Sequence, residues 1–291
     1  MKLNEEIKNK IRDYTGSDIS SVSSLSGGCI SDAYKLLLAN GGKLFLKLNF
    51  NSSKDMFVKE AHGLKELRKA NAIRIPEVLL FDSTYIVTEL IEIGSKSVNF
   101  FEDFGRKFAR LHKYTGNNFG FYEDNYIGSN PQPNVPDDEE KNDWVKFYLD
   151  KRILFQYKLA EKNGYVSAEL RKGISALEDK IYDILKGSEE KPSVLHGDLW
   201  GGNYMVDSEG KACLIDPAVY YGHREADLAM TKIFGGFDSR FYSAYNEYFP
   251  LPEGYEYREN IYKLYHILNH LNLFGSGYYH QAISLINSYM K

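Results

Sequence analysis

The chain has 291 residues, 43% of them hydrophobic, and a formal net charge of −4 at pH 7. A chain of this length can bury the core of one large domain or of two small lobes. The slight acidic balance argues against a nucleic-acid partner, and no apolar run approaches the roughly 20 residues needed to span a bilayer. We therefore expect neither nucleic acid nor a membrane as a partner.

The N-terminal segment, residues 1–16, predicts an amphipathic helix with Ile7 and Ile11 on its apolar face. It has no apolar stretch of the kind found in secretory signal peptides. The two cysteines, Cys29 and Cys213, stand far apart and suggest no disulfide framework. These features favour a cytoplasmic protein in a reducing environment.

The next part of the chain predicts a small sheet with one helix laid across it. Strands are expected where apolar residues alternate, and the helix where they recur at helical spacing. The predicted elements are a hairpin of strands 34–38 and 44–50 around an Asn-Gly-Gly turn at 40–42, a helix within 53–70, and strands near 75–78 and 85–93.

The rest of the chain is mainly helical, apart from a loop rich in proline and acidic residues at 119–143 and a short strand-loop-strand near residue 200. Helices are predicted within 100–114, 144–160, 167–187, 224–234, 238–248, 260–274 and 280–290. We therefore predict an α+β, bilobal fold. Residues 1–92 would form the N-terminal nucleotide-binding lobe, ending in a hinge, and residues 93–291 the catalytic and substrate lobe.

The strongest functional signal is the stretch from Val194 to Ala218, VLHGDLWGGNYMVDSEGKACLIDPA. Its HGDLWGGN matches the catalytic loop H-R-D-L-x-x-x-N of protein kinases, with glycine in place of arginine. Asp198 would then be the general base, and Asn203 and Asp216 would be ligands of Mg²⁺. Turn-capping by each residue alone is a plain alternative. All three in this order favour phosphoryl transfer within a protein-kinase-like fold.

A kinase of this type also needs a cation against the nucleotide phosphates. Lys47 interrupts the otherwise apolar strand 44–48, and Glu60 lies on the following helix, one turn after Phe57 and one before Leu64. The two side chains can form the lysine–glutamate pair that holds the lysine against the α- and β-phosphates. A solvent-facing lysine and an ordinary surface glutamate are the alternative.

Other nucleotide contacts are suggested by position in the chain. Gly27 and Gly28 precede the first predicted strand and could fold over the phosphates, although two adjacent glycines are also typical of a plain turn. The backbone of Glu89, Leu90 and Ile91, at the predicted hinge, would receive the adenine.

Several motifs resemble the fructosamine kinases, also called ketosamine-3-kinases, within the aminoglycoside-phosphotransferase-like kinases. The similar stretches are HGDLWGGN, LIDPAVYYGHREADLAM, GGCISDAY, FGFYEDNYIGSNPQPN, WVKFYLDKRI and EAHGLKEL. The most specific of them are the tryptophan after HGDL and the run GHREAD at residues 222–227. Together these stretches extend the resemblance over nearly the whole chain.

The resemblance implies phosphorylation of the 3-hydroxyl of ketosamines by ATP and Mg²⁺. The substrate would be a ribulosamine, erythrulosamine or fructosamine on a small or protein-bound amine. The phosphorylated sugar then leaves and frees the amine, which is a deglycation repair reaction. Kinases of the aminoglycoside or choline type are the alternative within the same chemistry, and a non-catalytic ATP-binding scaffold is the alternative outside it.

The remaining candidate residues have supporting or substrate roles. Trp200 could stack on the substrate, or be an ordinary core tryptophan. The 119–136 loop, with Asn134, could close over the sugar, or be a plain surface loop. His196 is expected to be structural. Asp227 is expected to hold the catalytic loop through backbone N–H groups.

The two cysteines have different expected roles. Cys213 falls in an apolar strand and is expected to be a buried small hydrophobe. Cys29 follows two glycines in a loop near Lys47. One hypothesis is that its thiol oxidises and crosslinks two chains, and the alternative is an inert thiol. We expect a monomer or a weak homodimer.

Overall fold

The computed structural model describes residues 3–25, 32–50 and 55–290. In chain order the elements are α1 (Glu5–Thr15), β1 (Ile19–Leu25), β2 (Asp32–Leu38), β3 (Lys43–Leu48), α2 (Met56–Lys69), β4 (Val78–Asp82), β5 (Tyr85–Glu89), α3 (Phe100–His112), β6 (Asn125–Ile127), β7 (Asn130–Gln132), α4 (Trp144–Tyr148), the π-helix η1 (Leu149–Leu154), α5 (Phe155–Lys162), α6 (Ala168–Leu185), β8 (Ser193–Leu195), β9 (Tyr204–Val206), β10 (Ala212–Leu214), β11 (Tyr220–Gly222), α7 (Glu225–Thr231), α8 (Ser239–Tyr248), α9 (Tyr255–Phe274), the 3₁₀ turn η2 (Ser276–Tyr278) and α10 (Tyr279–Asn287).

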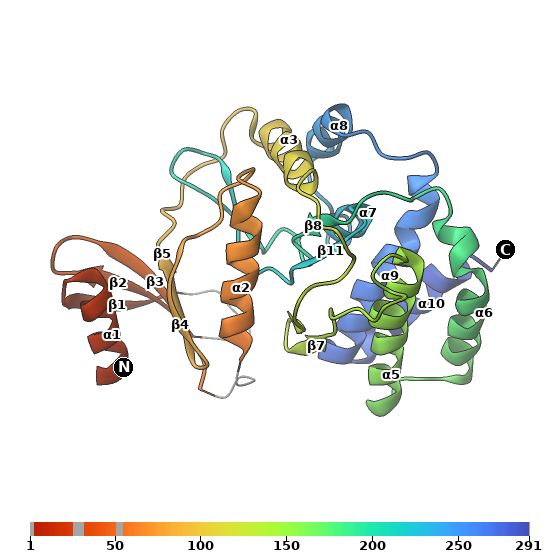
Figure 1. Cartoon of the computed structure of the whole chain (residues 1–291), viewed down its shortest axis with the longest axis horizontal. Helices are drawn as coiled ribbons and strands as arrows, with labels where there is room; N and C mark the ends of the chain where they lie inside the picture. Colours follow the sequence, from red (N-terminus) through yellow and green to blue (C-terminus); the bar gives the residue numbers. More distant parts are fainter. Residues whose placement is uncertain (1–2, 26–31, 51–54, 291) are drawn as a thin grey trace.

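The first part of the molecule is an antiparallel sheet with one helix on each face. The order of its strands is β1-β2-β3-β5-β4. Figure 1 shows α1 at the outer end of the molecule and α2 between the sheet and the helical part. This arrangement confirms the predicted α+β fold class.

Alternation along the strands decides which face of the sheet each side chain occupies. Leu36, Leu46 and Val87 pack with Ile7 and Ile11 of α1 in one apolar core. Because successive strand residues point to opposite faces, the intervening residues face α2. The sheet therefore presents an apolar face to α1 and the rest of its side chains to the helical part.

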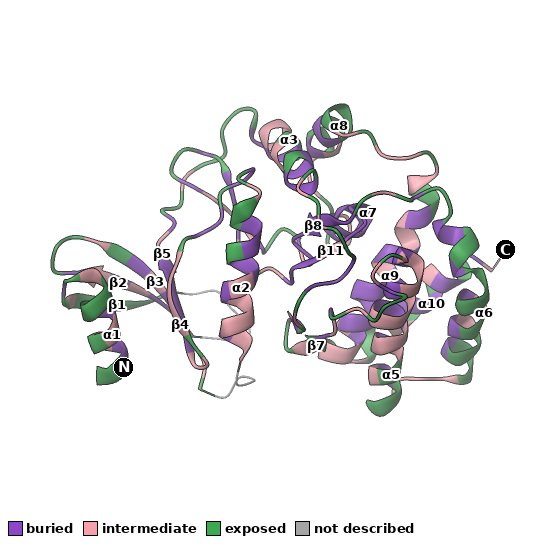
Figure 2. Ribbon diagram, in the orientation of Figure 1, coloured by how far each residue is buried: buried purple, intermediate pink, exposed green. Residues whose placement is uncertain are grey.

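Helix α2 belongs to the larger core rather than to the core beneath α1. Phe57, Ala61 and Leu64 are buried in the same apolar cluster as Phe104 of α3 and much of the helical part. Figure 2 shows both buried and exposed residues on α2. The helix that carries Glu60 therefore packs its buried apolar residues against the helical part.

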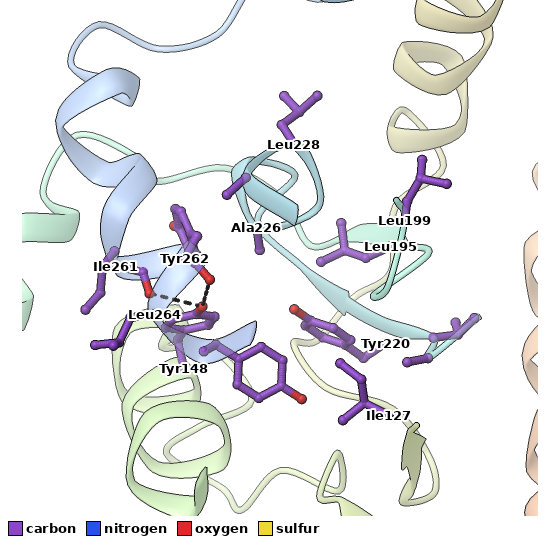
Figure 3. Packing of buried hydrophobic residues seen from close by; sticks show 14 of the residues in the cluster. Ile127, Tyr148, Leu195, Leu199, Tyr220, Ala226, Leu228, Ile261, Tyr262 and Leu264 are labelled. Carbon is purple, nitrogen blue, oxygen red and sulfur yellow. Dashed lines mark hydrogen bonds between the residues drawn. The ribbon is translucent and has the colours of Figure 1, made fainter. Parts of the chain in front are cut away.

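The helical part is built around α9 and contains short antiparallel hairpins. Strand β8 pairs with β11, β9 with β10, and β6 with β7. Figure 3 shows Tyr148 of α4 beside Tyr262 of α9, with the Tyr148 hydroxyl donating to the Tyr262 carbonyl oxygen at 3.2 Å. Tyr220 of β11 lies in the same cluster, which ties the hairpins to the helices.

Three local expectations differ from the structure. Strand β1 was not predicted, because its apolar residues Ile19, Val22 and Leu25 are three residues apart and do not alternate, and most of the strand is exposed. The single helix expected over 144–160 contains a π-helical segment. The 119–143 loop contains the hairpin of β6 and β7. Across the described ranges, no helix combines the length and apolar composition needed to cross a membrane.

A close contact between α3 and α8 provides a stability test. Gly105 lies where an added Cβ would approach the Phe241 carbonyl oxygen to 2.2 Å. Gly105→Ala is therefore expected to lower the free energy of unfolding by about 1–3 kcal/mol, the usual cost of overpacking. Urea unfolding measures the effect. Gly277→Ala is the control, because no heavy atom lies within 4 Å of its added Cβ. An equal loss of unfolding free energy in both variants would contradict the close contact between α3 and α8 at Gly105.

Candidate active site

Two loops that join the β8–β11 pair to the β9–β10 pair bring the predicted catalytic residues together. The loop from β8 to β9 carries Asp198 and Asn203, and the loop from β10 to β11 carries Asp216. Two backbone hydrogen bonds join the loops: Ile215 N–H donates to the Asn203 carbonyl at 3.1 Å, and Ala218 N–H donates to the carbonyl of the residue before Gly197 at 2.9 Å. The sequence motifs thus meet at one edge of the helical part.

Gly197 explains the departure from the protein-kinase motif. Its φ is +81°, in the left-handed region that favours glycine. An added Cβ would also lie 2.0 Å from the Ala218 carbonyl oxygen. No side chain fits there, so the arginine of the protein-kinase motif is excluded at this position.

Asp227 accepts hydrogen bonds from the backbone of the catalytic loop. Its carboxylate accepts from the N–H of His196 at 2.7 Å and from the N–H of Gly197 at 2.8 Å. His112 donates to it through Nε2 at 3.2 Å. Burial alone would raise the pKa of Asp227, but these partners outweigh burial and hold the pKa below its ordinary value. The carboxylate is therefore charged and fixed beneath the loop.

His196 completes the support of the loop from the other side. Its Nε2 donates to the Ile215 carbonyl at 2.9 Å, and its Nδ1 accepts from the Asp198 N–H at 3.3 Å. The ring is completely buried, and burial lowers its pKa below the ordinary value. A neutral imidazole ring that makes two hydrogen bonds to the backbone orients the loop.

Asn203 orients the Asp198 carboxylate. Its Nδ2 donates to the Asp198 carbonyl at 2.8 Å and to the Asp198 carboxylate at 3.1 Å. Burial raises the pKa of Asp198 well above its ordinary value, opposed by the bond from Asn203. A carboxyl with a raised pKa is better suited to accepting a proton than an ordinary surface aspartate.

Lys47 joins the sheet, α2 and the second loop. Its ammonium lies 2.8 Å from Glu60 and also contacts the carboxylate of Asp216. Burial alone would lower the pKa of Lys47, but the two carboxylates outweigh it and raise the pKa above the ordinary value. The predicted lysine–glutamate pair is present, with Asp216 as a third member.

Asp216 holds an unusual backbone conformation. Its φ is +53°, which is uncommon for a residue with a side chain. Such conformations cost of order 1–3 kcal/mol and cluster at functional sites. The carboxylate is 44% exposed, in contrast to the buried residues around it. The strained backbone turns an acidic side chain toward Lys47 and solvent.

Glu123 links α2 to the segment before β6, a contact that the sequence did not reveal. Its two carboxylate oxygens lie 2.7 Å from Lys59 Nζ and 2.8 Å from His62 Nδ1, both on α2. Close by, the Tyr126 hydroxyl donates to Asp55 at 2.6 Å. These contacts hold the helix that carries the lysine partner. A lone glutamate in an acidic loop gave no sequence signal of this role.

Asn134 does not lie where the sequence predicted. Its side chain is completely buried, donating to Asn125 at 2.7 Å and accepting from Arg152 at 2.6 Å. Gln132 is buried in the same network and accepts from Tyr265 at 2.6 Å. The prediction that Asn134 contacts the substrate is therefore wrong. This part of the loop is a polar core element.

Trp200, two residues after Asp198, has an exposed aromatic ring. Its side chain is 38% exposed, and its ring meets that of Phe234 edge-to-face at 5.6 Å. An added Cβ on Gly202 would approach the ring to 2.5 Å, so the glycine makes room for the indole. The alternative of an ordinary core tryptophan is excluded by this exposure.

The predicted hinge coincides with the end of β5. Glu89 is the last residue of that strand, and its carboxylate lies 2.9 Å from Arg74. Leu90 is half-buried and Ile91 is buried. Contact of their backbone with adenine stays a prediction.

The glycines and cysteines can be treated only in part. Gly27, Gly28 and Cys29 lie outside the described residues, so the phosphate-loop and redox predictions stay predictions. Cys213 is completely buried in β10, and burial raises the pKa of its thiol to about 12. The prediction of a buried, small apolar residue is confirmed for Cys213.

The GHREAD run is a buried scaffold around Asp227. Arg224 contacts Glu190 at 3.0 Å, and Glu225 contacts Arg258 at 2.6 Å. Burial lowers the pKa of His223 to about 3. Paired charges of this kind are costly to break one at a time, so the run fixes the helix that carries Asp227.

Comparison with solved structures defines the class of protein. The crystal structure of a protein provisionally assigned as a fructosamine-3-kinase from Thermobifida fusca has a TM-score of 0.88 at 30% identity, with 98% of this chain and 99% of that chain covered. The streptomycin-ATP-APH(2″)-IIa ternary complex has a TM-score of 0.63 at 16% identity, covering 99% and 97%. The fold is that of the protein-kinase-like small-molecule phosphotransferases.

Sequence comparison identifies the family. The model of the fructosamine kinase family matches residues 3–291. A chloroplastic protein-ribulosamine 3-kinase from Oryza sativa subsp. indica is 40% identical over 282 residues, covering 94% of this chain and 80% of that protein. The chain belongs to the fructosamine kinase family and is a kinase.

The support of the catalytic loop can be tested at Asp227. In Asp227→Ala two backbone N–H groups lose their acceptor, and kcat is expected to fall about 100-fold because the base is displaced. The KM for ATP is expected to stay near wild type, since Lys47 is untouched. Asp227→Asn, which keeps one acceptor oxygen, is expected to lose less. Steady-state kinetics measure kcat and KM at a temperature at which all variants are folded. An unchanged kcat in Asp227→Ala would contradict the role of Asp227 in supporting the catalytic loop.

The anchoring of α2 can be tested at Glu123. Glu123→Gln removes the charge that faces Lys59 and His62, and is expected to raise the KM for ATP about fivefold, the equivalent of about 1 kcal/mol for an ion pair. Glu247→Gln is the matched control, because its pair with Arg106 lies on the surface. Equal KM values for ATP in the two variants would show that the contacts of Glu123 with α2 do not affect ATP binding.

Proposed function

We propose that the chain transfers the γ-phosphoryl group of ATP to the 3-hydroxyl of a ketosamine. The observation that carries the proposal is the convergence of Asp198, oriented by Asn203, with Asp216 and the Lys47–Glu60 pair. Phosphoryl transfer requires a positioned base, a cation on the phosphates and metal ligands, and little covalent help from the protein. The family and its ribulosamine 3-kinase relative support the ketosamine as acceptor.

In this reaction Asp198 accepts the proton of the sugar hydroxyl as the hydroxyl oxygen attacks phosphorus. The raised pKa of the carboxyl favours that transfer. Lys47, held by Glu60, lies against the α- and β-phosphates once ATP has entered. Asp227 and His196 keep the base from turning away, through the backbone hydrogen bonds described above.

The residues present fit Mg²⁺. Asn203 and Asp216 offer a carboxamide and a carboxylate oxygen, the hard ligands that Mg²⁺ takes together with substrate phosphates. The amide of Asn203 makes its two hydrogen bonds to Asp198 through Nδ2, which leaves Oδ1 for a cation. When bound, the ion would neutralise charge on the phosphates. Release of Asp216 from Lys47 would accompany nucleotide binding.

The remaining contacts of the proposal are assigned by position. Gly27 and Gly28 would cover the phosphates, and the backbone at 89–91 would receive adenine between an N-terminal lobe of residues 1–92 and a C-terminal lobe of residues 93–291. Trp200 would stack on the substrate and exclude water from it. The phosphorylated sugar is then lost from its amine, whether that amine is free or protein-bound, which makes the reaction a deglycation repair.

The test is a panel of acceptors with wild type and Asp198→Asn. Wild type is expected to release ADP with ribulosyl- or erythrulosyl-lysine and not with kanamycin or choline. Asp198→Asn is expected to lose at least about 100-fold in kcat, the contribution of a general base, while calorimetry still detects ATP binding. Turnover of kanamycin or choline alone would shift the function to those kinases. No turnover by wild type of any acceptor would favour an ATP-binding scaffold.

A further inference from the structure

A continuous line of aromatic rings starts at the catalytic loop and leads away from it. The ring of Trp200 contacts Phe234 at 5.6 Å, and Phe234 contacts His270 at 5.0 Å. His270 in turn contacts Phe274 at 5.4 Å and Tyr278 at 5.2 Å. We call these five residues the aromatic strip. They come from three separate segments: the loop after β8, the segment after α7, and the end of α9 with η2.

Three of the five rings, those of Trp200, Phe234 and Phe274, are exposed, and those of His270 and Tyr278 are half-buried. Phe234 is 42% exposed and Phe274 is 63% exposed. Single exposed aromatic residues are common on protein surfaces and need no explanation. Contacting ones that form a patch are less common and mark binding sites more often than isolated ones do. The strip therefore differs from scattered exposed rings such as Tyr14 on α1.

The strip carries no formal charge at neutral pH. Burial lowers the pKa of His270, and its Nδ1 donates to the His266 carbonyl at 2.7 Å. The other members are Trp, Phe and Tyr side chains, whose ring faces attract cations. The surface thus suits an organic cation with an apolar stem, because it has no positive charge that would repel the cation.

We propose that the aromatic strip binds the amine portion of the ketosamine, namely the secondary ammonium and the lysine side chain and peptide attached to it. This inference rests on the proposed function. In a ketosamine, four covalent bonds separate the 3-hydroxyl oxygen from the amine nitrogen, so the two atoms lie within about 5 Å. With the hydroxyl at Asp198, the ammonium would lie close to the catalytic loop, which also carries Trp200 two residues further along the chain.

The order of the rings assigns different parts of the substrate to different residues. Along the strip, Trp200 lies nearest the catalytic loop and would meet the ammonium, and Phe234 comes next and would meet the lysine methylenes. His270 contacts Phe234 on one side and both Phe274 and Tyr278 on the other. Phe274 and Tyr278 therefore lie further from the catalytic loop and meet the peptide that flanks the lysine. In this arrangement the residues around Asp198 bind the sugar, and the aromatic strip binds the amine.

The experiment compares three ribulosamines that share the sugar and differ in the amine: the adducts of methylamine, of Nα-acetyllysine and of a lysine peptide with aromatic neighbours. Phe234→Ala is expected to raise the KM for the lysine and peptide adducts about fivefold, roughly the effect of one buried methylene lost from contact. Phe274→Ala is expected to raise the KM for the peptide adduct alone. The KM for the methylamine adduct, and kcat for all three, are expected to stay within about twofold of wild type.

Controls separate this inference from folding and from the proposed function. Phe274→Trp keeps a ring face and is expected to keep the wild-type KM, and Tyr14→Ala removes an exposed ring at the far end of the molecule and is expected to change nothing. The methylamine adduct reports that each variant is folded.

Two results would overturn the inference alone: KM values that shift equally for the three adducts, and KM values that do not shift. A fall in solution mass of the strip variants without a KM change would overturn it in favour of a contact between two copies of the chain. Failure of wild type to phosphorylate any ribulosamine would instead overturn the proposed function, and this inference with it.

Discussion

The site depends on one ammonium group. Lys47, on a central strand of the sheet, contacts Glu60 of α2 and Asp216 of the loop after β10. A largely buried charge that loses a partner costs several kcal/mol, more than the pair itself contributes to stability. The positions of the sheet, the helix and the loop are therefore coupled through this group. A shift of any one of them leaves a charge without its partner.

Helix α2 transmits this coupling because it belongs to two structures at once. Its residue Glu60 faces the sheet, while Phe57 and Leu64 lie in the apolar core of the helical part. Glu123 adds a contact with Lys59 and another with His62 on the same helix. A division of the chain near Glu92 follows the order of the sequence, but the packing ties this helix to the second part. Its orientation is thus decided by residues far from the phosphate site.

The parts of the site that the sequence predicted are those set by local pattern. Strand alternation alone turns Lys47 away from the leucines that face α1, and helical spacing puts Glu60 beside the buried stripe. The catalytic motif fixes its own loop, because Gly197 admits no side chain. The predicted support by Asp227 follows from the need of a tight loop for an acceptor of its N–H groups.

Long-range partners decided the parts that the sequence did not predict. An asparagine has the same hydrogen-bonding groups at the surface and in the core, so nothing local indicated that Asn134 would meet Arg152. Glu123 meets its partners on α2 across more than 60 residues of chain, since it lies 64 residues from Lys59. Strand β1 is held by pairing with β2 rather than by its own apolar pattern. Each of these requires the fold to be known first.

The two sides of the site differ in rigidity, and this difference bears on which substrates it can take. The base is surrounded by buried, fully partnered groups such as His196 and Asp227, which leave little freedom to the reacting atoms. The side that follows Trp200 is an open surface of rings. A lysine that belongs to a protein cannot be enclosed in a pocket, because the rest of the protein must stay outside. Under the proposed function, a closely hydrogen-bonded catalytic side next to a partly exposed, uncharged surface would meet both requirements, since it would fix the sugar hydroxyl while it left the amine attached to a larger partner.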